Sequence, residues 1–205
     1  INPPFPVVHE GQALEMHSVA DVENIILHYG AEQIACIIFE PVNHLKGMRQ
    51  TPREYLIGIR ELCDRYDIVM ITDEIVTGAS RTGEFLNTHQ FGVSADIVAL
   101  GKGISGGYYP ASAMVTSHKI ASVFDKPEPW IPFSYSHTYA SNPVSIAAIN
   151  ASMRVLEQIE AAGQLQKLIT KTQALCQEIA GNERIARIES QGLLIGITLD
   201  SSLGE

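Results

Sequence analysis

Short apolar runs bounded by polar residues or glycines recur through the first half of the chain. They cover residues 34–39, 68–72 and 97–100. Runs of this length are typical of buried strands, and the helical patterns that separate them favour parallel pairing. Glu40 follows the first run, Asp73 the second, and Lys102 lies just beyond the third. Because ligands bind at the carboxyl edge of a parallel sheet, we expect these three side chains to face one crevice.

Helix start and stop signals flank the first of these strands. Ser18, followed by Asp21, offers an N-cap for a helix that ends at Tyr29, where Gly30 follows. Residues 51–54 (TPRE) form a capping-box pattern with proline at the first helical position. They predict an amphipathic helix that runs to about residue 66 and connects two parallel strands.

The second half of the chain changes in pattern. Residues 111–116 predict a strand that follows the third run too closely for a crossover helix, so it should pair antiparallel with a neighbour. Asn142 and Pro143 open a long helix to about residue 161, and Gly163 separates it from a second helix to about residue 180. Two further strands are predicted at 184–189 and 193–199. The order of elements predicts an α/β fold with a mostly parallel sheet and flanking helices.

Lys102 and Asp73 are the kind of pair that pyridoxal phosphate (PLP) chemistry uses. An unprotonated lysine amine forms a Schiff base with an aldehyde, and PLP supplies such an aldehyde. The ring nitrogen of PLP must stay protonated, and a buried carboxylate holds that proton. A lysine between two glycines is as readily explained by an ordinary surface loop. Asp73 at the preceding strand end favours the catalytic interpretation.

Four segments resemble the class III (ω-type) aminotransferases of PLP fold type I. They are residues 39–42 (FEPV), 71–83 (ITDEIVTGASRTG), 95–107 (ADIVALGKGISGG) and 137–143 (HTYASNP). They occur in the family's order and at compatible spacing over nearly the whole chain. The resemblance implies a large domain built on a mostly parallel sheet, PLP as the cofactor, and a homodimer with shared active sites.

The resemblance also implies roles for particular residues. Lys102 matches the lysine that forms the Schiff base with PLP, and Asp73 matches the partner of the pyridine nitrogen. Ile75 takes the position that packs on one face of the ring, and Thr138 matches the threonine that reaches the phosphate of the neighbouring subunit's cofactor. Two roles remain open for Glu40, which either hydrogen-bonds within the cofactor network or caps a loop.

Domain organisation follows from the same resemblance. Residues 1–158 would form part of the PLP-binding large domain. Residues 159–205 would contain the end of the interdomain helix and the start of a small α+β C-terminal domain. The chain is thus expected to be a central part of a longer subunit.

The implied activity is transamination from an amine or ω-amino acid to an oxo acid such as pyruvate. Leu45 stands where many members that use 2-oxoglutarate carry a glutamate, which favours the smaller acceptor. Residues 79–80 (AS) replace the aromatic–glycine pair common in the family. Two alternatives remain open. One is a class III decarboxylase or aminomutase, and the other is a non-catalytic fragment that acts as a dimerisation module.

The amino-acid composition limits the kinds of partner that the protein is expected to bind. Lysine and arginine number 14 and aspartate and glutamate 23, which gives a net charge of −9 without any basic cluster and argues against nucleic acid. The sequence contains no apolar run of membrane-spanning length. The three cysteines are odd in number, lack metal-ligand spacing and mostly fall on strand or helix faces expected to be buried. Reduced thiols predict a cytoplasmic protein without a bound metal.

Two other known motifs partly match the segments around Lys102 and Asp73. Residues 101–106 (GKGISG) fit the dinucleotide pattern GxGxxG, but that fingerprint requires a following helix and an acidic residue at the next parallel strand end. The apolar strand that ends in Asp73 also resembles the metal-binding strand of P-loop ATPases. The phosphate loop of those proteins is absent from the sequence.

Overall fold

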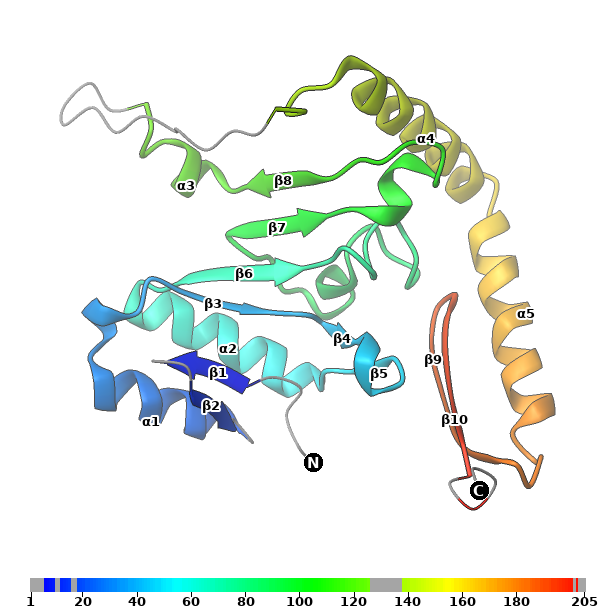
Figure 1. Ribbon diagram of the computed structural model, residues 1–205, viewed down its shortest axis with the longest axis horizontal. Coiled ribbons are helices and arrows are strands. Elements are labelled where there is room, and N and C mark those ends of the chain that lie inside the picture. Colours follow the sequence, from blue (N-terminus) through cyan, green and yellow to red (C-terminus); the bar gives the residue numbers. More distant parts are fainter. Residues whose placement is uncertain (1–5, 10–11, 16–17, 126–137, 201, 203–205) are drawn as a thin grey trace.

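A four-stranded sheet forms the centre of the computed structural model, which describes residues 6–9, 12–15, 18–125, 138–200 and 202 (Figure 1). The strands lie in the order β3 (Cys36–Phe39), β6 (Val69–Asp73), β7 (Ile97–Leu100) and β8 (Ala113–Thr116). The first three are parallel, and β8 is antiparallel to β7. The predictions of a mostly parallel sheet and of an antiparallel fourth strand are both confirmed.

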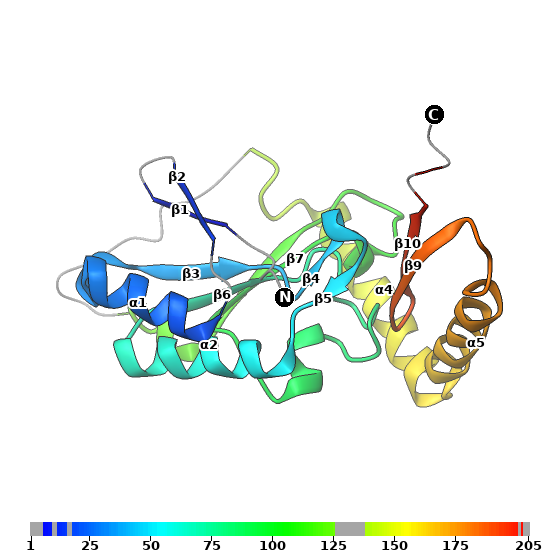
Figure 2. The same cartoon turned by 90° about the horizontal axis from the view of Figure 1, so that it is seen from below.

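Two helices, α1 (Val19–Tyr29) and α2 (Arg53–Tyr66), cover one face of this sheet (Figure 2). Strand alternation turns Met70 and Thr72 of β6 toward the helices, where both are fully buried, and gives Asp73 to the opposite face. The core between helices and sheet is made of Val22, Ile26, Phe39, Leu56, Ile59, Leu62, Cys63, Ile68, Met70 and Val93. Burial of these apolar side chains fixes the strands whose ends form the site.

The helix signals are partly confirmed. The Ser18 hydroxyl accepts a hydrogen bond from the Asp21 N–H at 3.2 Å, and Gly30 ends α1 with φ +85°. The capping box at residues 51–54 is wrong. Pro52 itself takes the N-cap position and α2 begins at Arg53, so Thr51 lies one residue too early to cap. The Thr51 hydroxyl is buried without a hydrogen-bond partner among the described residues.

The connections to and from β6 differ from one another. α2 is a full crossover helix between β3 and β6, whereas the β6–β7 connection contains only the short 3₁₀ helix η3 (Asn87–Phe91). The expectation of a crossover helix between parallel strands is therefore confirmed for β3 and β6 and wrong for β6 and β7. Smaller elements are the 3₁₀ helices η1 (Ala31–Gln33) and η2 (His44–Lys46), the strand pair β4 (Val42–Asn43) and β5 (Arg49–Gln50), the hairpin β1 (Pro6–His9) and β2 (Gln12–Glu15), and α3 (His118–Ala121).

The C-terminal part contains two helices and a hairpin. α4 (Pro143–Ala161) is capped by Asn142, whose side-chain oxygen accepts from the Val144 N–H at 2.9 Å. Gly163, with φ +64°, separates α4 from α5 (Gln164–Ile179), as predicted. β9 (Ile185–Gln191) and β10 (Leu194–Leu199) pair antiparallel. α4 continues through residue 158, and the division of the chain into domains 1–158 and 159–205 stays a prediction.

Candidate active site

Three of the predicted site residues meet at the carboxyl edge of the parallel strands. In the sheet register, Phe39 pairs with Thr72 and Asp73 pairs with Ala99. Glu40 and Asp73 therefore lie at the same level on neighbouring strands, and Lys102 follows the end of β7. Figure 1 shows the carboxyl ends of β6 and β7 pointing toward the same end of the molecule. The crevice residues predicted from the strand ends are thus brought to one edge.

Lys102 opens the 3₁₀ helix η4 (Lys102–Ser105) and is exposed. Within the described ranges its amine makes no hydrogen bond or ion pair. Its backbone has φ +42°, in the left-handed region that costs a non-glycine residue about 1–2 kcal/mol. Buried Ile104 and Ser105 follow it, and the Ile104 N–H donates to the Gly101 carbonyl at 3.1 Å. These contacts hold an otherwise unfavourable conformation that leaves the amine without a protein partner.

Asp73 is the last residue of β6 and is partly buried. Its Oδ1 accepts the N–H of Ile75 at 3.0 Å, which fixes the orientation of the carboxylate. The described residues provide no hydrogen-bond partner for Oδ2. The geometry leaves this negatively charged group able to accept one more donor, such as a protonated ring nitrogen.

The loop after β6 packs directly against the loop that carries Lys102. A Cβ added to Gly101 would lie 3.2 Å from Cγ2 of Ile75, and a Cβ added to Gly78 would lie 2.5 Å from Cδ2 of Leu100. A side chain at Gly78 would also meet the Glu74 carbonyl oxygen at 2.8 Å and would force a shift, whereas one at Gly101 would require Ile75 to move by a few tenths of an ångström. This packing places the apolar side chain of Ile75 against Gly101, the residue before Lys102.

Glu40 has a partner that the sequence analysis did not identify. Its Oε2 lies 2.6 Å from Nδ1 of His44, and both side chains are partly exposed. The contact links the end of β3 to η2, the short helix that also contains Leu45. Neither role considered for Glu40 is tested by this geometry. His44 was missed because a histidine in a loop carries no signal of its own until the fold places it beside a carboxylate.

Thr138 lies in the turn that precedes α4 and is exposed. Its position close to the N-terminus of a long helix suits a residue that contacts an anion. α4 packs against η4, so the Thr138 turn and the Lys102 helix belong to neighbouring elements. His137, the first residue of the same motif, lies outside the described residues.

Glu74 is the second residue that the sequence analysis missed. It directly follows Asp73, but its side chain is fully buried, with 0% exposure. Four hydrogen bonds reach its carboxylate from Thr77, Asn87 and Thr88. The available signal was strand alternation, which sends the neighbour of a crevice-facing aspartate toward the interior.

Other kinds of site were sought in the described parts of the chain. No group of three or more histidine, cysteine, aspartate or glutamate side chains is arranged there to hold a metal ion. No helix among these residues is both long and apolar enough to cross a bilayer.

The chain that carries these residues matches a known protein family. The family profile of the class III aminotransferases matches residues 2–204. The chain therefore belongs to the class III aminotransferase family. This finding confirms the resemblance stated from the four sequence segments.

Among curated relatives, an adenosylmethionine-8-amino-7-oxononanoate aminotransferase of Nitratidesulfovibrio vulgaris is 32% identical over 185 residues, which are 90% of this chain and 34% of the relative. An acetylornithine aminotransferase of Corynebacterium efficiens is 29% identical over 98% of this chain and 48% of the relative. The chain thus spans less than half the length of these curated relatives.

Solved structures show the same fold. An (S)-enantioselective ω-transaminase from Thermomicrobium roseum superposes with a TM-score of 0.78 at 28% identity, covering 89% of this chain and 40% of that one. An amine transaminase from an uncultivated Pseudomonas species, in its PLP-bound form, gives 0.77 at 31% identity, covering 89% and 42%. Class III aminotransferases depend on PLP. The amine of Lys102, the carboxylate of Asp73 and the apolar side chain of Ile75 are a donor set that fits this cofactor.

Proposed function

We propose that the full-length protein is a PLP-dependent transaminase that moves an amino group from an amine or ω-amino acid to an oxo acid such as pyruvate. The observation that carries the proposal is a lysine amine without a hydrogen bond or ion pair among the described residues, at the same sheet edge as an oriented carboxylate. Membership in the class III family supports it. The named relatives are aminotransferases, which favours this reaction over decarboxylation, amino-group migration or a purely structural role.

Four residues would hold the cofactor. Lys102 would bond to it covalently, Asp73 would accept the hydrogen bond of its ring nitrogen, and Ile75 would pack on one ring face. Thr138 would reach the phosphate of the partner subunit's cofactor. When bound, PLP supplies an aldehyde carbon and an electron-withdrawing ring. Glu40, paired with His44, lies one strand from Asp73 and would support this network.

The side chains of this chain would divide the work of the reaction. The Lys102 amine would hold the cofactor when no substrate is present and would be free once a donor amine is bound. The free Nζ would then accept the proton of the donor carbon as a general base and pass it on to a carbon of the cofactor. The negative charge of Asp73 would keep a proton on the ring nitrogen. The product of the donor would leave before the oxo acid enters, so we expect ping-pong kinetics.

The acceptor preference rests on Leu45. This residue is 84% exposed in η2, next to His44 at the same sheet edge. A leucine offers no charge for regulating access of the second carboxylate of 2-oxoglutarate. We therefore propose that pyruvate is the better acceptor. An ω-aminotransferase of Caulobacter vibrioides, which is 29% identical over 92% of this chain and 43% of the relative, supports an ω-amino donor.

We also propose a cytoplasmic homodimer with shared active sites and without nucleic-acid or membrane partners. The three cysteines Cys36, Cys63 and Cys176 are free thiols, which supports a reducing compartment. The net charge of −9 supports the absence of a nucleic-acid partner. Thr138 is exposed where a second subunit could contact it. Cys63 and Cys176 are buried, in line with the expectation for most of the cysteines, and Cys36 is exposed.

Reduction of the full-length protein with borohydride in the presence of PLP tests the central assignment. Peptide mapping should place a pyridoxyl group on Lys102. Lys119, an exposed lysine paired with Asp67, serves as the internal control and should stay unlabelled. Label on another lysine, or none at all, would overturn the assignment. Product assays with pyruvate and with 2-oxoglutarate then test the acceptor preference.

A further inference from the structure

We propose that Glu74 is a positioning residue that fixes Asp73 and Ile75 where they would hold the cofactor. The proposal rests on the proposed function, because it assigns Asp73 and Ile75 to the cofactor. Glu74 separates these two residues in the chain. Its buried side chain anchors their segment from the side opposite to the crevice.

The carboxylate of Glu74 connects two parts of the loop after β6, at Thr77 and at the start of η3. Its Oε2 accepts from the Thr77 hydroxyl at 2.5 Å and from the Asn87 N–H at 2.8 Å. Its Oε1 accepts from the N–H and the hydroxyl of Thr88, both at 3.1 Å. Two of the four donors are backbone N–H groups at the start of η3, which need acceptors because they are buried.

The backbone of Glu74 is held as firmly as its side chain. Its N–H donates to the Ala99 carbonyl of β7 at 2.9 Å, which extends the pairing of β6 and β7 past Asp73. Its carbonyl accepts from the Gly78 N–H at 2.7 Å. The residue is therefore fixed between the strand that leads to Lys102 and the turn that follows Ile75.

A carboxylate suits this position better than its amide. Every bond to Glu74 is one in which the side chain accepts, and an ionised carboxylate is acceptor-only. Glutamine would turn an NH₂ group toward either Asn87 or Thr88 and leave a buried backbone N–H without an acceptor. Such a loss costs about 1–3 kcal/mol and would let the segment move.

The experiment compares Glu74→Gln with Glu84→Gln in the full-length protein. Glu84 is an exposed glutamate in the same loop and controls for the loss of charge. At a temperature where far-UV circular dichroism shows both variants folded, Glu74→Gln should bind PLP roughly 10-fold more weakly. The absorbance of its bound cofactor should also titrate at a different pH. Glu84→Gln should match the wild type in both measurements.

A second background tests whether Glu74 acts through Asp73. In Asp73→Asn protein, adding Glu74→Gln should weaken PLP binding by a smaller factor than it does in the wild type. Equal factors in both backgrounds would overturn the positioning role. So would a folded Glu74→Gln protein with wild-type affinity and spectrum, because a merely structural residue changes unfolding and not the bound cofactor.

A milder variant covers the case in which Glu74→Gln fails to fold. Thr88→Val removes one hydroxyl donor and keeps the backbone N–H bond, so it should shift affinity and spectrum in the same direction by a smaller factor. Unchanged values for Thr88→Val would then contradict the proposal. If the wild type itself binds no PLP, the proposed function fails. If the wild type binds and the variants behave like it, only the role of Glu74 fails.

Discussion

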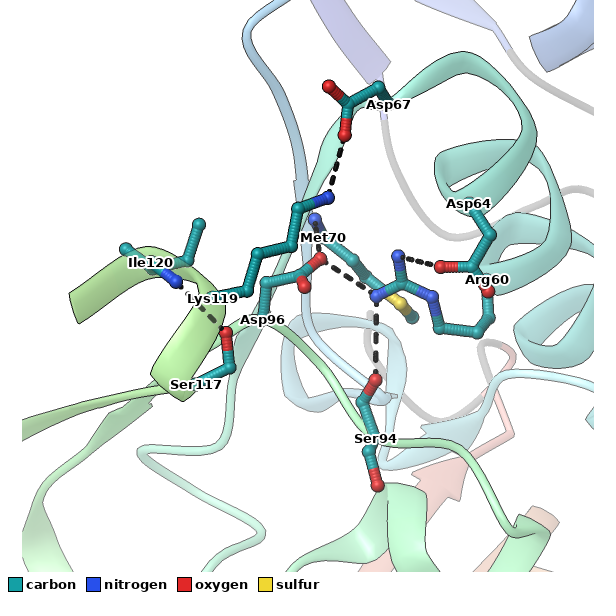
Figure 3. A network of polar contacts seen from close by, with 9 residues as sticks. All are labelled: Arg60, Asp64, Asp67, Met70, Ser94, Asp96, Ser117, Lys119 and Ile120. Atoms are coloured by element: carbon teal, nitrogen blue, oxygen red, sulfur yellow. Dashed lines mark hydrogen bonds and ion pairs between the residues drawn. The ribbon is translucent and has the colours of Figure 1, made fainter. Parts of the chain in front are cut away.

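One aspartate and one lysine at each edge of the central sheet differ in their contacts: Asp96 and Lys119 at the amino edge, and Asp73 and Lys102 at the carboxyl edge. At the amino edge, Oδ2 of Asp96 accepts from the Met70 N–H and from Arg60, both at 2.9 Å (Figure 3). Arg60 also donates to Asp64 at 2.8 Å, and Lys119 bonds to Asp67 at 2.6 Å. At the carboxyl edge, the Lys102 amine makes no such contact within the described residues.

The difference separates charges that serve the fold from charges reserved for a ligand. Asp96 and Asp73 both stand at ends of neighbouring strands, yet Asp96 is bonded to a cation, whereas among the described residues Asp73 is bonded only to the backbone N–H of Ile75. A charge already neutralised by the protein gains little from a ligand. A charge without a protein partner is able to bind a ligand. The two edges therefore differ in whether their charges are neutralised by the protein.

The largest expected effect comes from replacing one lysine at each edge. Lys102→Ala should abolish covalent PLP attachment and reduce turnover by orders of magnitude. Lys119→Ala should leave turnover and melting temperature unchanged, because its ion pair is exposed. Steady-state assays and thermal melts of both variants check the comparison. Substantial turnover by Lys102→Ala would remove the distinction between the edges.

Exchange of one aspartate at each edge should give effects of opposite kind. Asp73→Asn should lower turnover by orders of magnitude with little loss of stability. Asp96→Asn should cost about 1–3 kcal/mol of stability, since it weakens the bonds to Arg60 and Met70, and spare turnover by folded protein. Urea unfolding and activity assays measure both. Similar profiles for the two variants would contradict the comparison.

The pH dependence of stability should report on the amino edge. Burial by itself would raise the pKa of Asp96, but the Met70 N–H and the Arg60 guanidinium outweigh it and lower the pKa below its ordinary value of 3.8. The folded protein then binds this proton less readily than the unfolded chain. The stabilisation is therefore complete above pH 3.8 and is lost as the pH falls through the lowered value. Asp96→Asn should flatten this part of the curve in urea titrations between neutral and acidic pH.

The smallest effect concerns two residues with left-handed backbone, one at each edge. Asp67 ends α2 with φ +53°, and Lys102 has φ +42°. At both positions the glycine variant should have a free energy of unfolding about 1 kcal/mol higher than that of the alanine variant. At Asp64, inside α2, alanine should be the better residue. Denaturant unfolding of the six variants tests this, and the Lys102 variants should both be inactive.

The sequence predicted the elements that depend on local chemistry. Apolar runs located β3, β6 and β7, and the side chains of Ser18 and Asn142 cap their helices as expected. The capping box at Thr51 failed because Pro52 occupies the N-cap, while the Thr51 N–H donates to the Pro41 carbonyl at 2.9 Å, next to the β4–β5 pair. Local patterns do not report which residue the preceding chain places at the helix start.

The sequence predicted the main residues of the site but not the residues that hold them in place. Strand ends alone indicated Glu40, Asp73 and Lys102, since parallel strands share a carboxyl edge. Glu74 and His44 were missed because no sequence pattern indicates their hydrogen-bond partners. Those of Glu74 begin at Thr77 and extend to Thr88, and that of His44 is Glu40, the residue that follows β3. Such contacts follow from the packing of loops, which periodicity does not describe.

The antiparallel strand β8 has a consequence for the order in which the crevice assembles. Leu100 pairs with Ala113 through a short return of the chain, whereas Asp73 meets Ala99 across a longer connection. Short loops close at a lower entropic cost, so we expect β7 and β8 to pair first during folding. The turn that holds Lys102 would then form early, and β6 would bring Asp73 to a lysine that is already in place.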